Sequence, residues 1–92
     1  MKDSEVEVIL YGKVQKVGLR AYIQARAEEL DICGVTRNLD DNSVEVIAQG
    51  ERKKLGEFVK RIKKGSIFSK IEETDITWHD SSQDSMSDFT IE

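Results

Sequence analysis

The spacing of apolar residues is first that of a strand and then that of a helix. Val6, Val8 and Leu10 are separated by single residues, which predicts a strand over residues 5–11 with one apolar face. After a short loop, apolar residues recur at spacings of three or four, which predicts a helix over residues 20–31 with one face against a sheet. The apolar stripe of this helix consists of Leu19, Ile23, Ala27 and Leu30.

The same alternation of patterns continues to the end of the chain. The further elements predicted are strands over 34–39 and 44–49, a helix over 51–64, and strands over 70–79 and 88–91. Asp40, Asp41, Asn42 and Ser43 are expected to form a hairpin turn, since asparagine tolerates a positive φ. Residues 81–87 are expected to form a polar loop.

The order β-α-β-β-α-β is that of a ferredoxin-like, split βαβ fold. We therefore predict an α+β sandwich in which two helices cover one face of an antiparallel sheet. The first and third strands then flank each other at the centre, and the loop after the first strand lies near the middle of one sheet end. A chain of 92 residues is expected to form one domain, over residues 1–92.

Composition indicates the class of protein and the cellular compartment in which we expect it. The content of 38% apolar and 35% charged residues is typical of a soluble globular protein. No apolar run approaches the ~20 residues of a membrane helix, and no signal-peptide core follows Met1. Cys33 is the only cysteine, so no internal disulfide is expected. We expect a cytoplasmic protein with no membrane association, and nothing requires a partner chain, so a monomer is expected.

The charge is unevenly distributed along the chain. The net charge is −4, yet residues 51–64 carry seven of the 14 basic residues, and none follows Lys70. A basic helix face in solvent beside acidic strands is the simpler interpretation. RNA-recognition domains share this element order, but they stack bases on aromatic residues of the central strands, and residues 44–49 contain none. We therefore expect no nucleic-acid partner and keep RNA binding only as an alternative.

The loop between the first strand and the first helix carries the candidate chemistry. It reads G-K-V-Q-K-V-G-L-R from Gly12 to Arg20, with two glycines and an arginine at its exit. The first turn of a helix leaves its N–H groups without partners, and the helix dipole adds partial positive charge there. Arg20 adds a full charge and a planar fork of donors. This arrangement predicts an anion site, most naturally for phosphate, although the string is neither a P-loop nor a dinucleotide fingerprint.

Three strings of this sequence resemble the acylphosphatase family. They are G-K-V-Q-K-V-G-L-R, G-V-T-R-N and S-V-E-V-I-A-Q-G, and they are similar to the family's G-x-V-Q-G-V-G-F-R, G-W-V-x-N and D-G-x-V-E-V-x-x-x-G. The resemblance covers about residues 6–92. It implies hydrolysis of a small-molecule acyl phosphate to a carboxylate and inorganic phosphate, without a metal or cofactor.

The resemblance also implies roles for individual residues. Carried over by position, Arg20 is the phosphate-binding side chain and Asn38 holds the attacking water. The backbone N–H groups that would bind the phosphoryl oxygens belong to Gln15, Lys16, Val17, Gly18, Leu19 and Arg20. The chemistry is reasonable, since a carboxylate leaving group with a pKa near ~4 departs without a general acid. His79, the only histidine, is expected at the surface and not in catalysis.

Three departures from the family pattern keep a second function open. Lys16 stands where the family has glycine, and a positive φ there would cost ~1–3 kcal/mol or reshape the loop. Leu19 replaces phenylalanine, and Val35-Thr36 replaces Trp-Val, which we expect to remove an aromatic wall next to the water site. The alternative is a weakly active or inactive module of the same fold that binds phosphate or carbamoyl phosphate.

Overall fold

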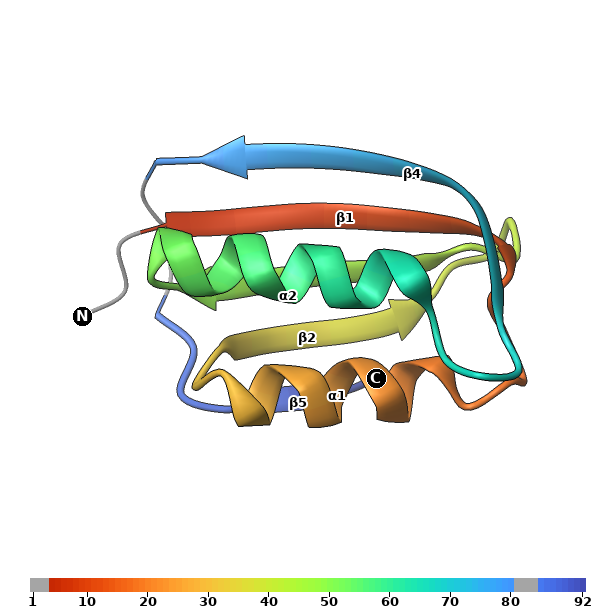
Figure 1. The fold of residues 1–92 in the computed structure, drawn as a ribbon, viewed down its shortest axis with the longest axis horizontal. Helices are drawn as coiled ribbons and strands as arrows, with labels where there is room; N and C mark the ends of the chain where they lie inside the picture. The colour runs from red at the N-terminus through yellow and green to blue at the C-terminus, as the bar shows by residue number, and fades with distance from the viewer. Residues whose placement is uncertain (1–3, 81–84) are drawn as a thin grey trace.

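The computed structural model describes residues 4–80 and 85–92, which form two helices and a five-stranded sheet (Figure 1). In chain order the elements are β1 (Ser4–Lys13), α1 (Leu19–Glu29), β2 (Cys33–Asn38), β3 (Val44–Gly50), α2 (Arg52–Lys64), β4 (Lys70–His79) and β5 (Phe89–Ile91). Every predicted element is present, with ends shifted by two residues or fewer. Of the predicted polar loop, residues 81–84 lie outside the described residues.

The sheet has the strand order β4-β1-β3-β2-β5, so β1 and β3 are neighbours inside it, as predicted. The ferredoxin-like fold is confirmed, with one correction to the expected antiparallel sheet. The four longer strands pair antiparallel, but β5 pairs parallel to β2, and the sheet is therefore mixed. The reason is that the chain leaves β4 at the sheet end where β2 begins, and then enters beside β2 in the same direction.

Both helices lie on one face of the sheet (Figure 1), and the core fills the space between them. The side chains of Val6, Val8 and Leu10 in β1 are fully buried there. Phe58 of α2 meets Phe89 of β5 edge to face, with ring centroids 6.0 Å apart. The predicted stripes are confirmed, except that Leu30 is only half-buried. The buried members are Leu19, Ile23 and Ala27 in α1, and Leu55, Phe58, Val59 and Ile62 in α2.

The other side of the sheet, which we call the open face, carries alternate residues of the same strands. No helix of the described residues covers it. Its charged side chains form pairs: Glu7 of β1 lies 2.7 Å from His79 of β4, and Arg37 of β2 lies 3.3 Å from Glu45 of β3. His79 is thus exposed at the surface, as predicted.

Three connections meet at one end of the sheet and position the candidate site. They are the β1–α1 loop, the β2–β3 turn and the α2–β4 connection (Figure 1). β1 reaches this end through a bulge at Gly12, which has φ 124°. A Cβ on Gly12 would lie 2.3 Å from the carbonyl oxygen of Lys70, so only glycine lets β4 start this close.

Candidate functional site

The loop over residues 14–18 takes two left-handed conformations. Val14 fixes its start, because that side chain is only 2% exposed and belongs to the core. Lys16 has φ 64° and Gly18 has φ 75°. A left-handed conformation costs a lysine ~1–2 kcal/mol relative to glycine. Lys16 therefore adopts a backbone conformation that glycine would favour.

The start of α1 has no local partner for its free N–H groups. Gly18 is the N-cap, and no side chain of the described residues caps the helix. The first helical hydrogen bond runs from the N–H of Tyr22 to the carbonyl of Gly18 (3.1 Å). The first turn contains no acidic residue, so nothing within it neutralises the positive end of the helix dipole. This helix start therefore favours an anion.

Arg20 stands in this first turn and is tied to the last residues of the chain. One of its guanidinium nitrogens, Nη1, donates to the backbone carbonyl of Glu92. One turn further along α1, Gln24 Nε2 donates to the carbonyl of Phe89 (2.9 Å). These two bonds join α1 to β5. A guanidinium has five N–H donors, so the bond to Glu92 orients Arg20 and leaves other donors for a ligand.

The β1–α1 loop and Arg20 enclose a pocket of about 200 Å³, which we call the loop pocket. Four of the six predicted substrate-binding residues line it: Lys16, Gly18, Leu19 and Arg20. Gln15 and Val17 do not line it. The other lining residues are Val14, Ala21 and Ile91. The loop pocket thus combines two cationic side chains with a helix start, which suits a small anion.

The side chain of Gln15 makes a connection that the sequence did not indicate. Its Nε2 donates to the carbonyl of Leu39 (3.0 Å) and to the carbonyl of Ser43 (2.9 Å). The β1–α1 loop is therefore bonded to the β2–β3 turn, which follows Asn38 directly. We call this the Gln15 bridge. No local pattern could reveal it, since the acceptors are backbone groups 24 and 28 residues away.

The β2–β3 turn is itself well ordered by hydrogen bonds. The carboxylate of Asp41 accepts bonds from the hydroxyl and the backbone N–H of Ser43, and these bonds lower the pKa of Asp41 below its usual value. Asn42 has φ 72°, which confirms the prediction of a positive φ in this turn. The N–H of Leu39 donates to Ser43 (2.9 Å). Asn38 thus enters a turn of fixed geometry.

Asn38 ends β2 on the helix-covered face of the sheet. It pairs with Val44, which pairs in turn with Leu10. Directly opposite residues point to the same face, and the side chains of Val44 and Leu10 are both fully buried under the helices. Asn38 therefore shares the face and the sheet end with the start of α1, and its side chain is exposed. It does not line the loop pocket.

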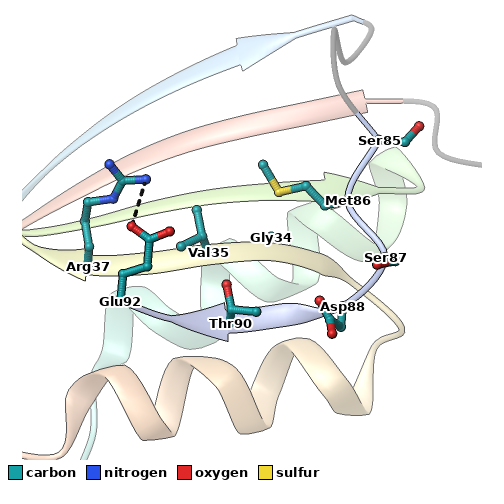
Figure 2. Close-up of a pocket in the computed structure, with 9 residues that line it drawn as sticks. All are labelled: Gly34, Val35, Arg37, Ser85, Met86, Ser87, Asp88, Thr90 and Glu92. Atoms are coloured by element: carbon teal, nitrogen blue, oxygen red, sulfur yellow. Dashed lines mark ion pairs between the residues drawn. The ribbon is translucent and has the colours of Figure 1, made fainter.

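Val35, three residues before Asn38 in β2, corrects one expectation about the site. Val35 points to the open face, opposite to Asn38, because the two positions differ by an odd number along the strand. A change from tryptophan to valine there removes no wall beside Asn38. Val35 instead lines a separate pocket of about 380 Å³ on the open face (Figure 2). Figure 2 also shows Arg37 and Glu92 directed toward each other, with 3.5 Å between Nη2 and Oε1.

Residues 4–80 and 85–92 offer neither a metal centre nor a membrane-spanning helix. These residues contain no group of three or more His, Cys, Asp or Glu side chains that could hold a metal ion. Neither helix has the length and apolar character needed to cross a membrane. Cys33 is a free, half-buried cysteine.

The chain matches known proteins over nearly its full length. The family model described as Acylphosphatase matches residues 6–91. The chain is 46% identical over 65 residues to the acylphosphatase of Petrotoga mobilis, which covers 71% of this chain and 73% of the relative. It is 37% identical over 73 residues to the acylphosphatase of Bacillus subtilis, covering 79% of this chain and 80% of the relative. The crystal structure of acylphosphatase from Bacillus subtilis superposes with a TM-score of 0.91 at 34% identity, over 96% of this chain and 97% of that one. This chain belongs to the acylphosphatase family.

Proposed function

We propose that this protein hydrolyses acyl phosphates to a carboxylate and inorganic phosphate, with the phosphoryl group held in the loop pocket. One observation carries the proposal. The family's loop folds here into a pocket where Lys16, Arg20 and the uncapped start of α1 meet. Within the described part of the chain, no ion pair joins Lys16 to a carboxylate, and Arg20 bonds only to the backbone oxygen of Glu92. An anion with several oxygens, such as phosphate, would supply the missing acceptors.

The binding step uses backbone and side-chain donors together. The N–H groups of residues 15–20 donate hydrogen bonds to the phosphoryl oxygens, and Arg20 contributes a planar fork of donors. These donors stay in place while negative charge shifts during the reaction, so they stabilise the transition state without rearrangement. Arg20 is therefore proposed as the main anchoring charge, and Lys16 as a mobile second one.

In the chemical step, water attacks phosphorus while the bond to the acyl oxygen breaks. We assign the orientation of that water to the Asn38 side chain. The leaving carboxylate takes the bonding electrons, and with a pKa near ~4 it needs no general acid. The proton of the water passes to a phosphoryl oxygen of the substrate, so no protein base is required. The Gln15 bridge acts indirectly, since it fixes the turn after Asn38 relative to the phosphate loop.

Lys16 supports a second candidate, a module that binds phosphate but turns over slowly. Its φ of 64° leaves the course of the loop intact, which favours the enzyme. Its long side chain lines the loop pocket, however, where a glycine would have none. A lysine that occupies the position of the attacking water would bind phosphate and suppress turnover. The two candidates differ in catalysis and not in binding, so a turnover assay separates them.

The proposed setting is a monomeric, metal-independent enzyme of one domain that works in the cytoplasm. The single cysteine rules out an intrachain disulfide, as suits a reducing compartment. We also propose that it has no nucleic-acid partner, because β3 offers no aromatic residue for base stacking and two basic residues of α2 form ion pairs within the protein. Lys54 lies 3.7 Å from Asp31, and Arg61 lies 3.0 Å from Glu29.

The test is phosphate release from benzoyl phosphate, measured for the wild type and for Arg20→Ala. We expect turnover by the wild type, competitive inhibition by inorganic phosphate, and a loss of about 10²–10³-fold in kcat/KM for Arg20→Ala. Arg26→Ala is the matched control, because Arg26 is on the same helix but pairs with Glu29. A wild type that binds phosphate without turnover would favour the second candidate, and an active Arg20→Ala variant would refute the anchoring role.

A further inference from the structure

The connection between α2 and β4 exposes two large apolar side chains. Ile67 is 90% exposed and Phe68 is 70% exposed, more than any other large hydrophobic residue in the described part of the chain. Burying such a side chain is worth ~1.5–3 kcal/mol, and the fold makes no use of this gain for either residue. Polar neighbours flank the pair on both sides, at Ser66 and Ser69.

The two residues stand at the tip of a hydrogen-bonded turn. The N–H of Ser69 donates to the carbonyl of Ser66 (3.1 Å), and the Ser69 hydroxyl donates to the same oxygen (3.0 Å). Ile67 and Phe68 are therefore the two central residues of a four-residue turn. Gly, Pro, Asn, Asp and Ser dominate such positions, whereas a β-branched and an aromatic residue break the local rule. A residue pair that breaks a local rule without structural gain points to a function.

The base of this turn is docked on the phosphate loop. The hydroxyl of Ser66 donates to the backbone carbonyl of Val17 (3.4 Å), and Val17 lies between Lys16 and Gly18, which both line the loop pocket. Figure 1 shows the α2–β4 connection passing beside the β1–α1 loop. Apolar residues also line the loop pocket, and one of them, Ile91, is 40% exposed. The turn that carries the exposed pair is thus bonded to the loop of the candidate site although it is distant in sequence.

We propose that Ile67 and Phe68 contact the acyl group of the substrate and give the enzyme a preference for acyl phosphates with aromatic or long aliphatic groups. This inference rests on the proposed hydrolysis. When the amides and Arg20 hold the phosphoryl oxygens, the acyl group extends away from the loop pocket through the remaining bridging oxygen. An apolar acyl group is then partly removed from water by contact with the pair. Acetyl phosphate is too short to gain from such a contact.

The size of the patch favours a small molecule over a protein partner. A stable protein interface takes roughly 20–30 residues from each side, whereas this patch has two apolar residues with serines on either side and Lys70 after them. A phenyl ring or a short alkyl chain matches two side chains in extent. The charge also agrees, because Lys16 and Arg20 receive the phosphate while the apolar pair receives the uncharged part of the same molecule.

The experiment compares two substrates on one set of variants. We expect the double variant Ile67→Ser/Phe68→Ser to lower kcat/KM for benzoyl phosphate about 10-fold, chiefly through KM. Its kcat/KM for acetyl phosphate should stay within about 2-fold of the wild type, since that substrate does not reach the pair. Ile47→Thr, which changes a half-buried residue of the open face, is the matched control and should leave the ratio of the two substrates unaltered.

The ratio of kcat/KM for benzoyl phosphate to kcat/KM for acetyl phosphate distinguishes the possible outcomes. A wild type that hydrolyses both substrates, with the same ratio in the double variant, overturns the acyl contact and leaves the proposed function intact. A wild type that hydrolyses neither overturns both. If the double variant abolishes a concentration-dependent association of the wild type and keeps the ratio, the patch is a self-association surface, and the acyl contact is again refuted.

Discussion

Asn38 and Arg37 are neighbours in β2, yet they belong to two different environments. Arg37 points to the open face, where Glu45 and Glu92 lie 3.3 and 3.5 Å from its guanidinium. Asn38 points to the helix-covered face, at the sheet end that also holds the loop pocket. The same contrast holds for the cations of each region. His79 on the open face is paired with Glu7, whereas within the described residues Lys16 has no ion-pair partner and Arg20 bonds to the backbone oxygen of Glu92.

This difference supports the loop pocket, and not the open face, as the proposed anion site. On the open face the charges are already neutralised by side chains of the sheet itself, so an external anion gains little. At the loop pocket Lys16 has no ion-pair partner among the described residues, and the helix start adds positive charge. The strand period of two is what separates the regions, because adjacent residues face opposite sides. Substitutions one residue apart should therefore have unlike consequences.

Asn38→Ala provides the largest expected effect on this comparison. The variant should lower kcat for benzoyl phosphate by about 10²-fold with little change in KM, because the proposed role of the carboxamide is to orient water and not to bind substrate. Steady-state kinetics of phosphate release measure both constants. The stability of the variant should be close to that of the wild type, since the side chain is exposed.

Arg37→Ala is the control from the other face. It removes two partly exposed ion pairs, which together are worth at most about 1 kcal/mol of unfolding free energy, and kcat should not change. The backbone of Glu92 stays in place because its N–H donates to Thr36 (2.9 Å), so its carbonyl still orients Arg20. Equal losses of kcat in the two variants would contradict the separation of the faces, and an unaltered kcat in Asn38→Ala would remove Asn38 from the mechanism.

The fold was predictable where the spacing of apolar residues indicates which side of an element is buried. The stripe around Phe58 and the alternation of Val6 and Val8 describe which side of each element meets the core, and both are confirmed. The parallel pairing of β5 was not predictable, because a strand of three residues carries no signal for its direction. β1 continues to Lys13 because it pairs with β4 through the bulge at Gly12, beyond the end of its apolar pattern.

The candidate site was predictable only in its local part. The glycine-bearing loop and Arg20 follow one another in sequence, so their shared pocket could be expected. The contacts that orient them come from distant residues: Arg20 bonds to Glu92, and Val17 accepts a bond from Ser66. The Gln15 bridge is of the same kind. The wall expected at Val35 was wrong because a sequence motif does not state which face of the sheet each of its residues occupies. The catalytic roles of Arg20 and Asn38 stay predictions.

Lys16→Gly tests the loop-pocket side of the comparison with a smaller expected effect. Glycine relieves the left-handed strain, so the free energy of unfolding should rise by about 1 kcal/mol, less the entropy of a flexible glycine. The same change removes one cation, and KM for benzoyl phosphate should rise about 3-fold while kcat stays the same or increases. Denaturant unfolding and steady-state kinetics measure these two effects.

Lys16→Ala separates the two causes. It removes the charge but keeps a side chain at φ 64°, so it should share the higher KM and not the added stability. If Lys16→Gly proved less stable than both the wild type and Lys16→Ala, the left-handed conformation would not be a source of strain. A large increase in kcat for Lys16→Gly would instead identify the wild type as a slow phosphate-binding module.

The pair of His79 and Glu7 gives the smallest expected effect and tests the open face. The hydrogen bond to Glu7 raises the pKa of His79 above its usual value of 6.5, and the nearby charges of Glu7 and Glu5 add to this. Protonated His79 is therefore favoured by folding. Its contribution to stability should be complete below about pH 6.5 and should disappear as the pH rises through the higher pKa of the folded state. Unfolding free energies of the wild type and His79→Gln, measured between pH 5.5 and pH 9, should differ most at the acidic end.

Glu7→Gln sharpens this prediction, because it removes the charge that raises the pKa and keeps a hydrogen-bonding side chain. The pH dependence of its stability should resemble that of His79→Gln, and neither variant should change kcat. The reason is that His79 and Glu7 pair with each other on the open face, whereas the loop pocket lies at the end of the covered face. A difference between wild type and His79→Gln that stays constant with pH would contradict the pairing, and a matching change in kcat would show that the two faces are coupled.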